Sequence, residues 1–162
     1  MKAIPLTHGK EAFVDDEDYD YLSQWKWSLE PRRRSCYVRR KQYGLSRSTN
    51  VYLHQVVAER GGLGQGPGDI DHIDGNGLNN QRTNLRAATR SQNNANQRIS
   101  RRNRSGFKGV YWSRAARKWA AQIGVSGKHK YLGVFSTETE AARAYNLAAL
   151  MEFGEFARLN SV

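Results

Sequence analysis

Hydrophobic and polar positions alternate most clearly in the last third of the chain. Three segments there have the length and the alternation of strands: 107–112, 118–125 and 129–135. In the middle segment, Trp119, Ala121 and Ile123 share one face, and small or polar side chains occupy the other. Thr137 and Glu140 then form a capping-box pattern that starts an alanine-rich helix. The pattern predicts a small three-stranded antiparallel sheet packed on one helix.

The amino-terminal third of the chain shows a second group of short alternating segments. They are residues 4–7, 12–14, 36–41 and 50–53, and the first two flank a turn, as in a hairpin. Asp15 or Asp16 is placed to cap a short helix, because the acidic residues that follow favour a helix N-terminus. Tyr19, Leu22 and Trp25 have helical spacing and are expected in the core. This third of the chain is therefore predicted to be rich in β structure.

The middle of the chain is divided by turns. Residues 54–59 favour a helix, which the glycine-rich residues 61–68 end. Residues 70–73 read as a short strand, residues 74–77 as a tight turn, and residues 87–96 as a second helix.

Charge narrows the possible functions. The chain has 162 residues and a net charge of +11, but residues 75–137 contain thirteen lysines and arginines and no carboxylate. A protein surface that only has to be soluble usually mixes positive and negative side chains. A long run of positive residues without acids is instead typical of proteins that bind a polyanion and release its counterions. A membrane surface is the weaker alternative, since no long amphipathic helix carries these charges. The sequence thus predicts a nucleic-acid-binding protein.

Other features of the sequence limit where the protein acts. Cys36 is the only cysteine, which excludes an internal disulfide and a cysteine-rich zinc site. No apolar run approaches the roughly 18 residues that a membrane span needs, and no signal peptide is seen. We expect a cytoplasmic protein of a bacterial or phage-infected cell.

Residues 71–93 contain the residue types needed to hydrolyse a phosphodiester. Hydrolysis requires a base for water and neutralisation of charge at phosphorus. His72 suits the base, because its ordinary pKa lies near about 6.5. Asp71 and Asn93 offer the hard oxygen ligands that Mg²⁺ accepts. Asn84 is expected to hydrogen-bond backbone across the loop and hold the His72 strand.

Two structural interpretations compete with that site. A calcium loop counted from Asp71 places Arg82 where the bidentate glutamate belongs, and one counted from Asp69 lacks the glycine at its sixth position. That interpretation fails. The second, a simple turn, applies to residues 74–77.

The motifs resemble those of the HNH endonucleases, especially the homing-type branch. The matching residues are Asp71-His72-Ile73-Asp74-Gly75-Asn76, Asn84-Leu85-Arg86 and Thr89-Arg90-Ser91-Gln92-Asn93. The resemblance implies a ββα-metal finger in which Asp71 and Asn93 bind one Mg²⁺ or Mn²⁺, His72 activates water and Asn84 orients His72. It also implies products with a 5′-phosphate and a 3′-hydroxyl. His54 recurs in such proteins, and we interpret it as structural or phosphate-contacting.

The last part of the chain resembles the plant apetala and ethylene-response-factor DNA-binding domains. The matching residues are Gly109-Val110, Lys118-Trp119-Ala120-Ala121-Gln122-Ile123, Tyr131-Leu132-Gly133 and Glu140-Ala141-Ala142-Arg143-Ala144-Tyr145. In that family the sheet lies in the major groove of DNA. The resemblance implies DNA contacts from Lys108, Tyr111, Arg114, Arg117, Gln122, His129 and Tyr131. Several of these positions differ in the plant proteins, so the plant sequence preference does not transfer.

Further basic residues are candidates for contacts with double-stranded DNA. Four of them are expected on a sheet face of the amino-terminal segment: Arg32, Arg33, Arg39 and Arg40. Arg86 and Arg90 lie within the nuclease-like motifs. Three more lie in an arm that either enters a DNA groove or serves as a flexible tether: Arg101, Arg102 and Arg104.

Together these patterns predict an α+β protein with an amino-terminal β-rich segment, a ββα-metal nuclease finger and a carboxy-terminal sheet-and-helix domain. The expected boundaries are 1–52, 53–97, a linker at 98–106, and 107–162. The predicted function is metal-dependent DNA cleavage of homing type, with a monomer nicking one strand. The alternatives are a DNA-binding regulator that does not cleave and, more weakly, an RNA-binding or RNA-cleaving protein.

Overall fold

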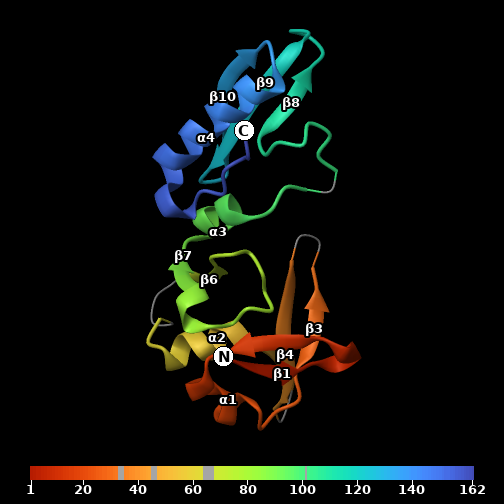
Figure 1. Cartoon of the computed structure of the whole chain (residues 1–162), viewed down its shortest axis with the longest axis vertical. Helices are drawn as coiled ribbons and strands as arrows, with labels where there is room; N and C mark the ends of the chain where they lie inside the picture. The colour runs from red at the N-terminus through yellow and green to blue at the C-terminus, as the bar shows by residue number, and fades with distance from the viewer. Residues whose placement is uncertain (33–34, 45–46, 64–67, 101) are drawn as a thin grey trace. The chain divides into compact units, whose positions relative to one another are not determined.

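The computed structural model describes residues 1–32, 35–44, 47–63, 68–100 and 102–162. They form two compact units, residues 1–89 and residues 90–162, which we describe separately. Both units mix helices and strands, as expected for an α+β protein (Figure 1). The boundary between the units falls after Thr89, inside the segment 53–97 expected to form the nuclease finger.

The first unit is built from short strands and helices. In chain order they are β1 (Lys2–Pro5), η1 (Thr7–Gly9), β2 (Glu11–Val14), α1 (Asp16–Leu22), β3 (Ser28–Pro31), β4 (Cys36–Tyr43), β5 (Ser48–Tyr52), α2 (Leu53–Arg60), β6 (Asp69–His72), η2 (Arg82–Asn84) and β7 (Leu85–Ala88). β1 and β2 form the expected hairpin, β3, β4 and β5 form an antiparallel sheet, and β6 pairs with β7.

One hydrophobic core joins the whole first unit. Its buried members are Ile4, Leu6, Ala12, Val14, Leu22, Trp27, Val38, Leu53, Val57 and Leu85. Because this core contains residues from β1 through β7, residue 52 does not separate two compact bodies. The amino-terminal strands and the β6–β7 hairpin are packed as one structure.

The acidic helix α1 is attached to the loop between β6 and β7. Asp15 is the N-cap residue by position, but its side chain makes no capping bond. Its carboxylate instead accepts hydrogen bonds from the Gln81 side chain (3.2 Å) and the Arg82 backbone (2.8 Å). Asp18, fully buried, accepts from Arg60 and Arg82. The acidic residues therefore hold this loop in addition to favouring the helix N-terminus.

In its described residues, 90–100 and 102–162, the second unit contains one sheet and two main helices. Its elements are α3 (Arg90–Asn96), β8 (Val110–Ser113), β9 (Lys118–Val125), β10 (Lys128–Phe135), α4 (Glu138–Phe153) and η3 (Gly154–Phe156). The antiparallel strand order is β10-β9-β8, and α4 packs on the sheet. Thr137 and Glu140 form both bonds of the capping box. The predicted sheet and helix are confirmed.

Three expected elements differ from the structure. The strand expected at 107–112 is β8, which begins only at Val110. Ala87 and Ala88 belong to β7, and the helix starts only at Arg90, because residues 85–88 pair with β6. Part of the expected arm is folded: Asn103 donates a hydrogen bond to the Phe107 carbonyl. A polar side chain can hold such a segment without a hydrophobic residue.

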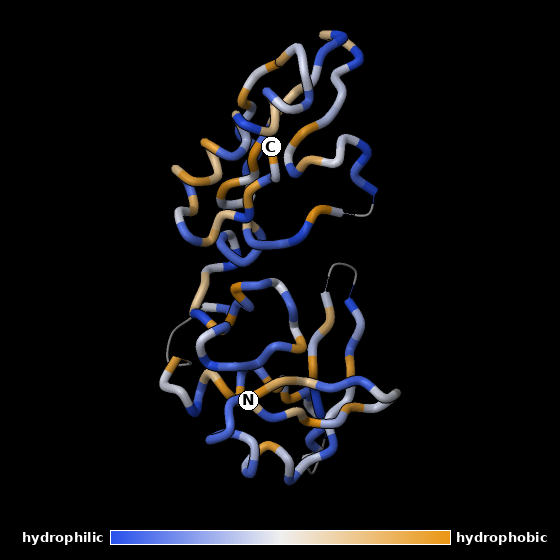
Figure 2. The backbone as a smooth tube through the Cα atoms, viewed as in Figure 1, coloured by the Kyte–Doolittle hydropathy of each residue, from blue (hydrophilic) through white to orange (hydrophobic). Residues whose placement is uncertain are grey.

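Figure 2 shows hydrophobic and hydrophilic positions interspersed along both units, as expected where short amphipathic elements surround small cores. Among the described residues, no helix has the length and apolar character that crossing a membrane requires.

Candidate active site

Asp71 and His72 lie together at the end of β6. They pair across the ladder with Arg86 and Leu85 of β7, and each is only 5% exposed. Successive side chains of a strand point to opposite faces. Asp71 and His72 therefore have separate partners, although they are neighbours in the sequence.

The imidazole of His72 is held by Asn80, a residue of the β6–β7 loop (residues 73–84). His72 Nε2 lies 3.2 Å from Asn80 Oδ1, and Asn80 Nδ2 donates to the Gly77 carbonyl, also at 3.2 Å. Because the donor end of the amide is used by Gly77, its oxygen faces His72 and requires a proton on Nε2. Nδ1 of His72 then carries the lone pair. In this tautomer Nδ1 is the basic nitrogen of the imidazole.

Burial keeps His72 neutral at neutral pH. Loss of solvent lowers its pKa from 6.5, while the hydrogen bond to Asn80 and the charges of Asp74 and Asp71 act in the opposite direction. The net shift is downward. A base must be unprotonated to accept a proton, so the shift favours the active form.

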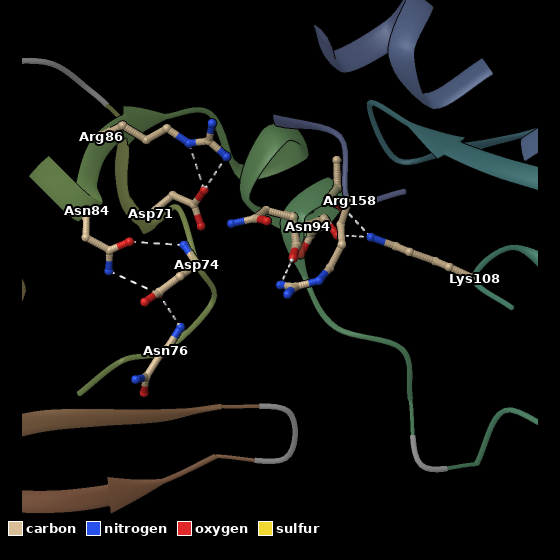
Figure 3. A network of polar contacts seen from close by, with 10 residues as sticks. Asp71, Asp74, Asn76, Asn84, Arg86, Asn94, Lys108 and Arg158 are labelled. Carbon is tan, nitrogen blue, oxygen red and sulfur yellow. Dashed lines mark hydrogen bonds and ion pairs between the residues drawn. The ribbon is translucent and has the colours of Figure 1, made fainter. Parts of the chain in front are cut away.

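Asn84 organises the backbone that follows His72 (Figure 3). Its Oδ1 accepts from the Asp74 backbone at 3.1 Å, and its Nδ2 donates to Asp74 Oδ1 and to the Asn79 carbonyl. The expectation that Asn84 bonds the backbone across the loop is confirmed. The contact with the imidazole, however, comes from Asn80. Asn84 acts on His72 only through the loop.

Asp74 is the acceptor at the centre of the loop. Its carboxylate receives hydrogen bonds from the Asn76 backbone and from the side chains of Asn79 and Asn84. Burial opposes ionisation, but these bonds and His72 together lower the pKa of Asp74. The backbone turns here in a different register from the expected 74–77: the Gly75 N–H donates to the His72 carbonyl, and the Asn79 N–H donates to the Asn76 carbonyl. Gly75 has a positive φ of 69°, and Asp74 anchors the loop.

Asp71 is paired with Arg86 in the first unit (Figure 3). Its Oδ2 accepts from Arg86 Nη2 at 3.0 Å and from Nε at 3.1 Å. The Arg86 side chain is 13% exposed, so its guanidinium is committed to the buried carboxylate. If Arg86 also contacts DNA, its guanidinium must bind a phosphate and Asp71 at the same time.

Asn93 lies on α3 in the second unit, where it is half-buried. The carboxylate of Asp71 and the amide of Asn93 are hard oxygen donors, which fit Mg²⁺ or Mn²⁺. Their joint use as a metal site remains a prediction from the sequence.

The carboxyl end of α3 is held by two basic side chains of its own unit. Lys108 Nζ donates to the carbonyls of Asn94, Ala95 and Gln97, and Arg158 donates to that of Asn96. Cations favour the carboxyl end of a helix, where carbonyls lack partners. Lys108, expected to contact DNA, is thus committed to α3.

His54, on α2, packs against the His72 ring at 5.1 Å between centroids. Burial lowers its pKa to about 3, so it is neutral. Tyr37 and Tyr52 complete an aromatic group around it, with ring centroids 5.2 and 5.7 Å away. These contacts place His54 in a buried aromatic group, and its role as a structural or phosphate-contacting residue stays a prediction.

The arginines expected on one amino-terminal face lie in different surroundings. Arg39 bonds Asn50 and pairs with Glu30, whereas the Arg40 guanidinium lies 4.7 Å from the Trp25 ring. Arg39 and Arg40 were expected on one face of the sheet, but Arg40 stacks on Trp25 on the core side and Arg39 lies on the opposite side. Arg32 also pairs with Glu30. Arg33 and Arg101 lie outside the described residues.

Most remaining candidates lie on the surface. Those in the exposed class are Arg90, Arg102, Arg104, Tyr111, Arg114, Arg117, His129 and Tyr131. Gln122 is half-buried. Tyr131 pairs with Gln122, His129 with Gly124 and Tyr111 with Ala120. Because directly paired residues share a face of the sheet, Tyr111, His129, Tyr131 and Gln122 lie together on the face opposite α4.

Sequence reasoning missed two kinds of site residue. Asn80 stands among several asparagines, and only the fold shows which one reaches His72. Asp18 and Arg82 are far apart in sequence, and their buried ion pair follows from the docking of α1 on the loop. The signal for Asn80 was its position in the conspicuous Asn79-Asn80 pair.

Comparisons with known proteins identify the family of the segment that contains these residues. Residues 51–95 match the HNH endonuclease family. A protein of Acanthamoeba polyphaga mimivirus, named as an uncharacterized HNH endonuclease, is 33% identical over 157 residues, covering 95% of this chain and 76% of that protein. Protein 3.8 of Escherichia phage T7 is 42% identical over 59 residues, 36% of this chain and 49% of the phage protein. An ethylene-responsive transcription factor of Medicago truncatula is 40% identical over 72 residues, 43% of this chain and 30% of the plant protein.

Proposed function

This chain belongs to the HNH endonuclease family and is a nuclease, and we propose that it cleaves double-stranded DNA with His72 as the general base. The observation that carries this role is the bond between His72 Nε2 and Asn80 Oδ1. It directs the lone pair of Nδ1 away from Asn80. His72 then takes a proton from the water that attacks phosphorus.

The proposed cofactor is one Mg²⁺ or Mn²⁺ held by Asp71 and Asn93. When bound, the ion would stabilise negative charge on the phosphate and the departing oxygen. Arg86 supports this role of Asp71, since its guanidinium compensates the buried carboxylate and fixes one of its oxygens. Asn84 positions the loop that carries Asn80.

The carboxy-terminal sheet is proposed to anchor the enzyme on DNA. Its face opposite α4 exposes Tyr111, His129 and Tyr131, and the likeness to a plant transcription factor supports the assignment. The basic and neutral composition of residues 75–137 is complementary to a phosphate backbone.

We further propose that the enzyme is of the homing type, acts as a monomer in the cytoplasm and nicks one strand. One base and one metal site cut one phosphodiester, leaving a 5′-phosphate and a 3′-hydroxyl. A double-strand break would require a second binding event.

A plasmid-nicking assay tests the proposal. Wild-type protein with MgCl₂ is expected to relax supercoiled plasmid, and His72→Ala to lower the rate about 10²–10⁴-fold, the usual contribution of general acid–base catalysis. Mobility-shift titration in EDTA should give similar DNA affinity for both proteins. His72→Gln serves as a matched variant that preserves polarity at the buried position.

Equal nicking by wild type and His72→Ala would remove His72 from the mechanism. Binding without nicking by the wild type in either Mg²⁺ or Mn²⁺ would favour the DNA-binding regulator. Cleavage confined to RNA would assign a different substrate.

A further inference from the structure

The sheet β3–β4–β5 is fixed against the loop that positions His72. The Phe13 backbone bonds Leu78 and Asn80 (2.8 and 2.7 Å), which joins the loop to β2. Gly77 approaches the sheet so closely that a Cβ at this position would lie 1.8 Å from the Cys36 carbonyl oxygen. The β1–β2 hairpin and the β3–β4–β5 sheet are therefore both in contact with the β6–β7 loop.

The two faces of this sheet have different characters. Val38 is fully buried, and the Arg40 guanidinium stacks on the same side at 4.7 Å from the ring of Trp25. One residue along the strand, Arg39 and Lys41 point to the other face. The structure thus separates two arginines that are adjacent in sequence. The Arg39 side chain is 28% exposed and paired with Glu30, and together with the exposed Lys41 it defines what we call the open face.

The open face leads to His72 through aromatic side chains. Tyr37 lies on it next to Arg39, with its ring 5.2 Å from His54 and 6.2 Å from His72. Tyr52 is the cross-strand partner of Arg39. Ring packing through Tyr37 therefore connects the strand that carries the basic side chains to the buried imidazole of His72.

We propose that this face binds the phosphate backbone of duplex DNA next to the phosphodiester that is cut, with Lys41 and Arg39 as its phosphate contacts. The proposal rests on the proposed DNA cleavage and adds a second anchoring surface, separate from the carboxy-terminal sheet. Charge complementarity supports it: Arg32, Arg39 and Lys41 outnumber Glu30, which pairs with two of them and is the only acidic residue in the sequence from 28 to 52. Contacts of this kind give affinity and register without reading bases.

Lys41→Gln is the informative variant, because Lys41 is exposed and its replacement leaves the core intact. Lys10→Gln is the matched control: it removes the same charge from an exposed lysine of the same unit, outside this sheet. The probe is a 60-base-pair duplex of arbitrary sequence, and binding is measured in EDTA between about 50 and 200 mM salt. These conditions exclude cleavage.

Loss of one phosphate contact should reduce the slope of log affinity against log salt by about 0.9 in Lys41→Gln. Arg39→Gln together with Lys41→Gln should roughly double that change, while Lys10→Gln keeps the wild-type slope. In nicking with Mg²⁺, Lys41→Gln should raise KM and leave kcat unchanged.

An unchanged slope in Lys41→Gln, or an equal reduction in Lys10→Gln, would overturn the proposal. So would a loss seen with single-stranded RNA and absent with the duplex. Failure of the wild type to nick would instead refute the proposed function, since the salt slope is measured without cleavage.

Discussion

Asn80 offers the sharpest test of how this site works. Its side chain is fully buried and makes two hydrogen bonds, to His72 Nε2 and to the Gly77 carbonyl. Asn80→Ala removes one hydrogen bond from each of these two buried partners, which costs about 1–3 kcal/mol each in the free energy of unfolding. It also frees the imidazole to rotate and to change tautomer. Residues that orient a reactive group in this way typically contribute about 10–100-fold to activity, or about 1.4–2.8 kcal/mol in the activation free energy.

Asn80→Asp tests the effect of charge next to His72 while keeping an oxygen that can orient its imidazole. It keeps an oxygen for Nε2 but loses the donor to Gly77, and its carboxylate stabilises the protonated imidazole. Burial lowers the pKa of His72 in the wild type, so cleavage should persist below pH 6.5 and decline only as the lowered pKa is passed. In Asn80→Asp the pKa of His72 rises, and the decline should begin at higher pH.

The assay is the pH dependence of kcat/KM for plasmid nicking with MgCl₂, which reports the free enzyme's essential base. Thermal unfolding monitored by circular dichroism at each pH gives the folded fraction. If Asn80→Ala matched the wild type in rate, and Asn80→Asp matched it in the position of the acidic decline, Asn80 would not be the partner of the catalytic imidazole.

Three further predictions concern stability. Gly77→Ala forces a methyl group toward the Cys36 carbonyl and should destabilise the first unit by about 1–3 kcal/mol in urea unfolding; a free energy of unfolding equal to that of wild type would contradict this packing. Asp18→Asn breaks the buried ion pairs with its two arginine partners and should cost about 3–5 kcal/mol. Burial opposes ionisation of Asp18, but hydrogen bonds and charge from the arginines lower its pKa below 3.8. The difference in the free energy of unfolding between wild type and Asp18→Asn should therefore be complete above pH 3.8 and shrink as the pH falls through the lowered pKa. A difference that does not change with pH would refute this prediction. Lys108→Ala removes the ammonium that donates hydrogen bonds to the carboxyl end of α3 and should destabilise the second unit by about 1.5–3 kcal/mol. Lys118→Ala, at an exposed lysine, is the control, and equal losses of stability in the two variants would show that the bonds to α3 contribute nothing.

Local patterns determined much of this protein. The alternation in β9 and the capping box at Thr137 predicted the second unit's sheet and helix, since both signals act over a few residues. The motif around Asp71 and His72 predicted nuclease chemistry, and the family comparison agrees. Local signals also misplaced the start of α3, because pairing with β6 decides the state of Ala87 and Ala88.

Tertiary structure decided which of several chemically similar side chains does what. Asn80 and Asn84 are both plausible partners for His72, and only the path of the β6–β7 loop brings Asn80 to it. Arg39 and Arg40 have the same chemistry, yet the pleat of β4 sends one to the open face and the other onto Trp25. A sequence lists donors, acceptors and charges in order along the chain. Their pairing depends on distances between residues that the chain brings together only when the core has formed.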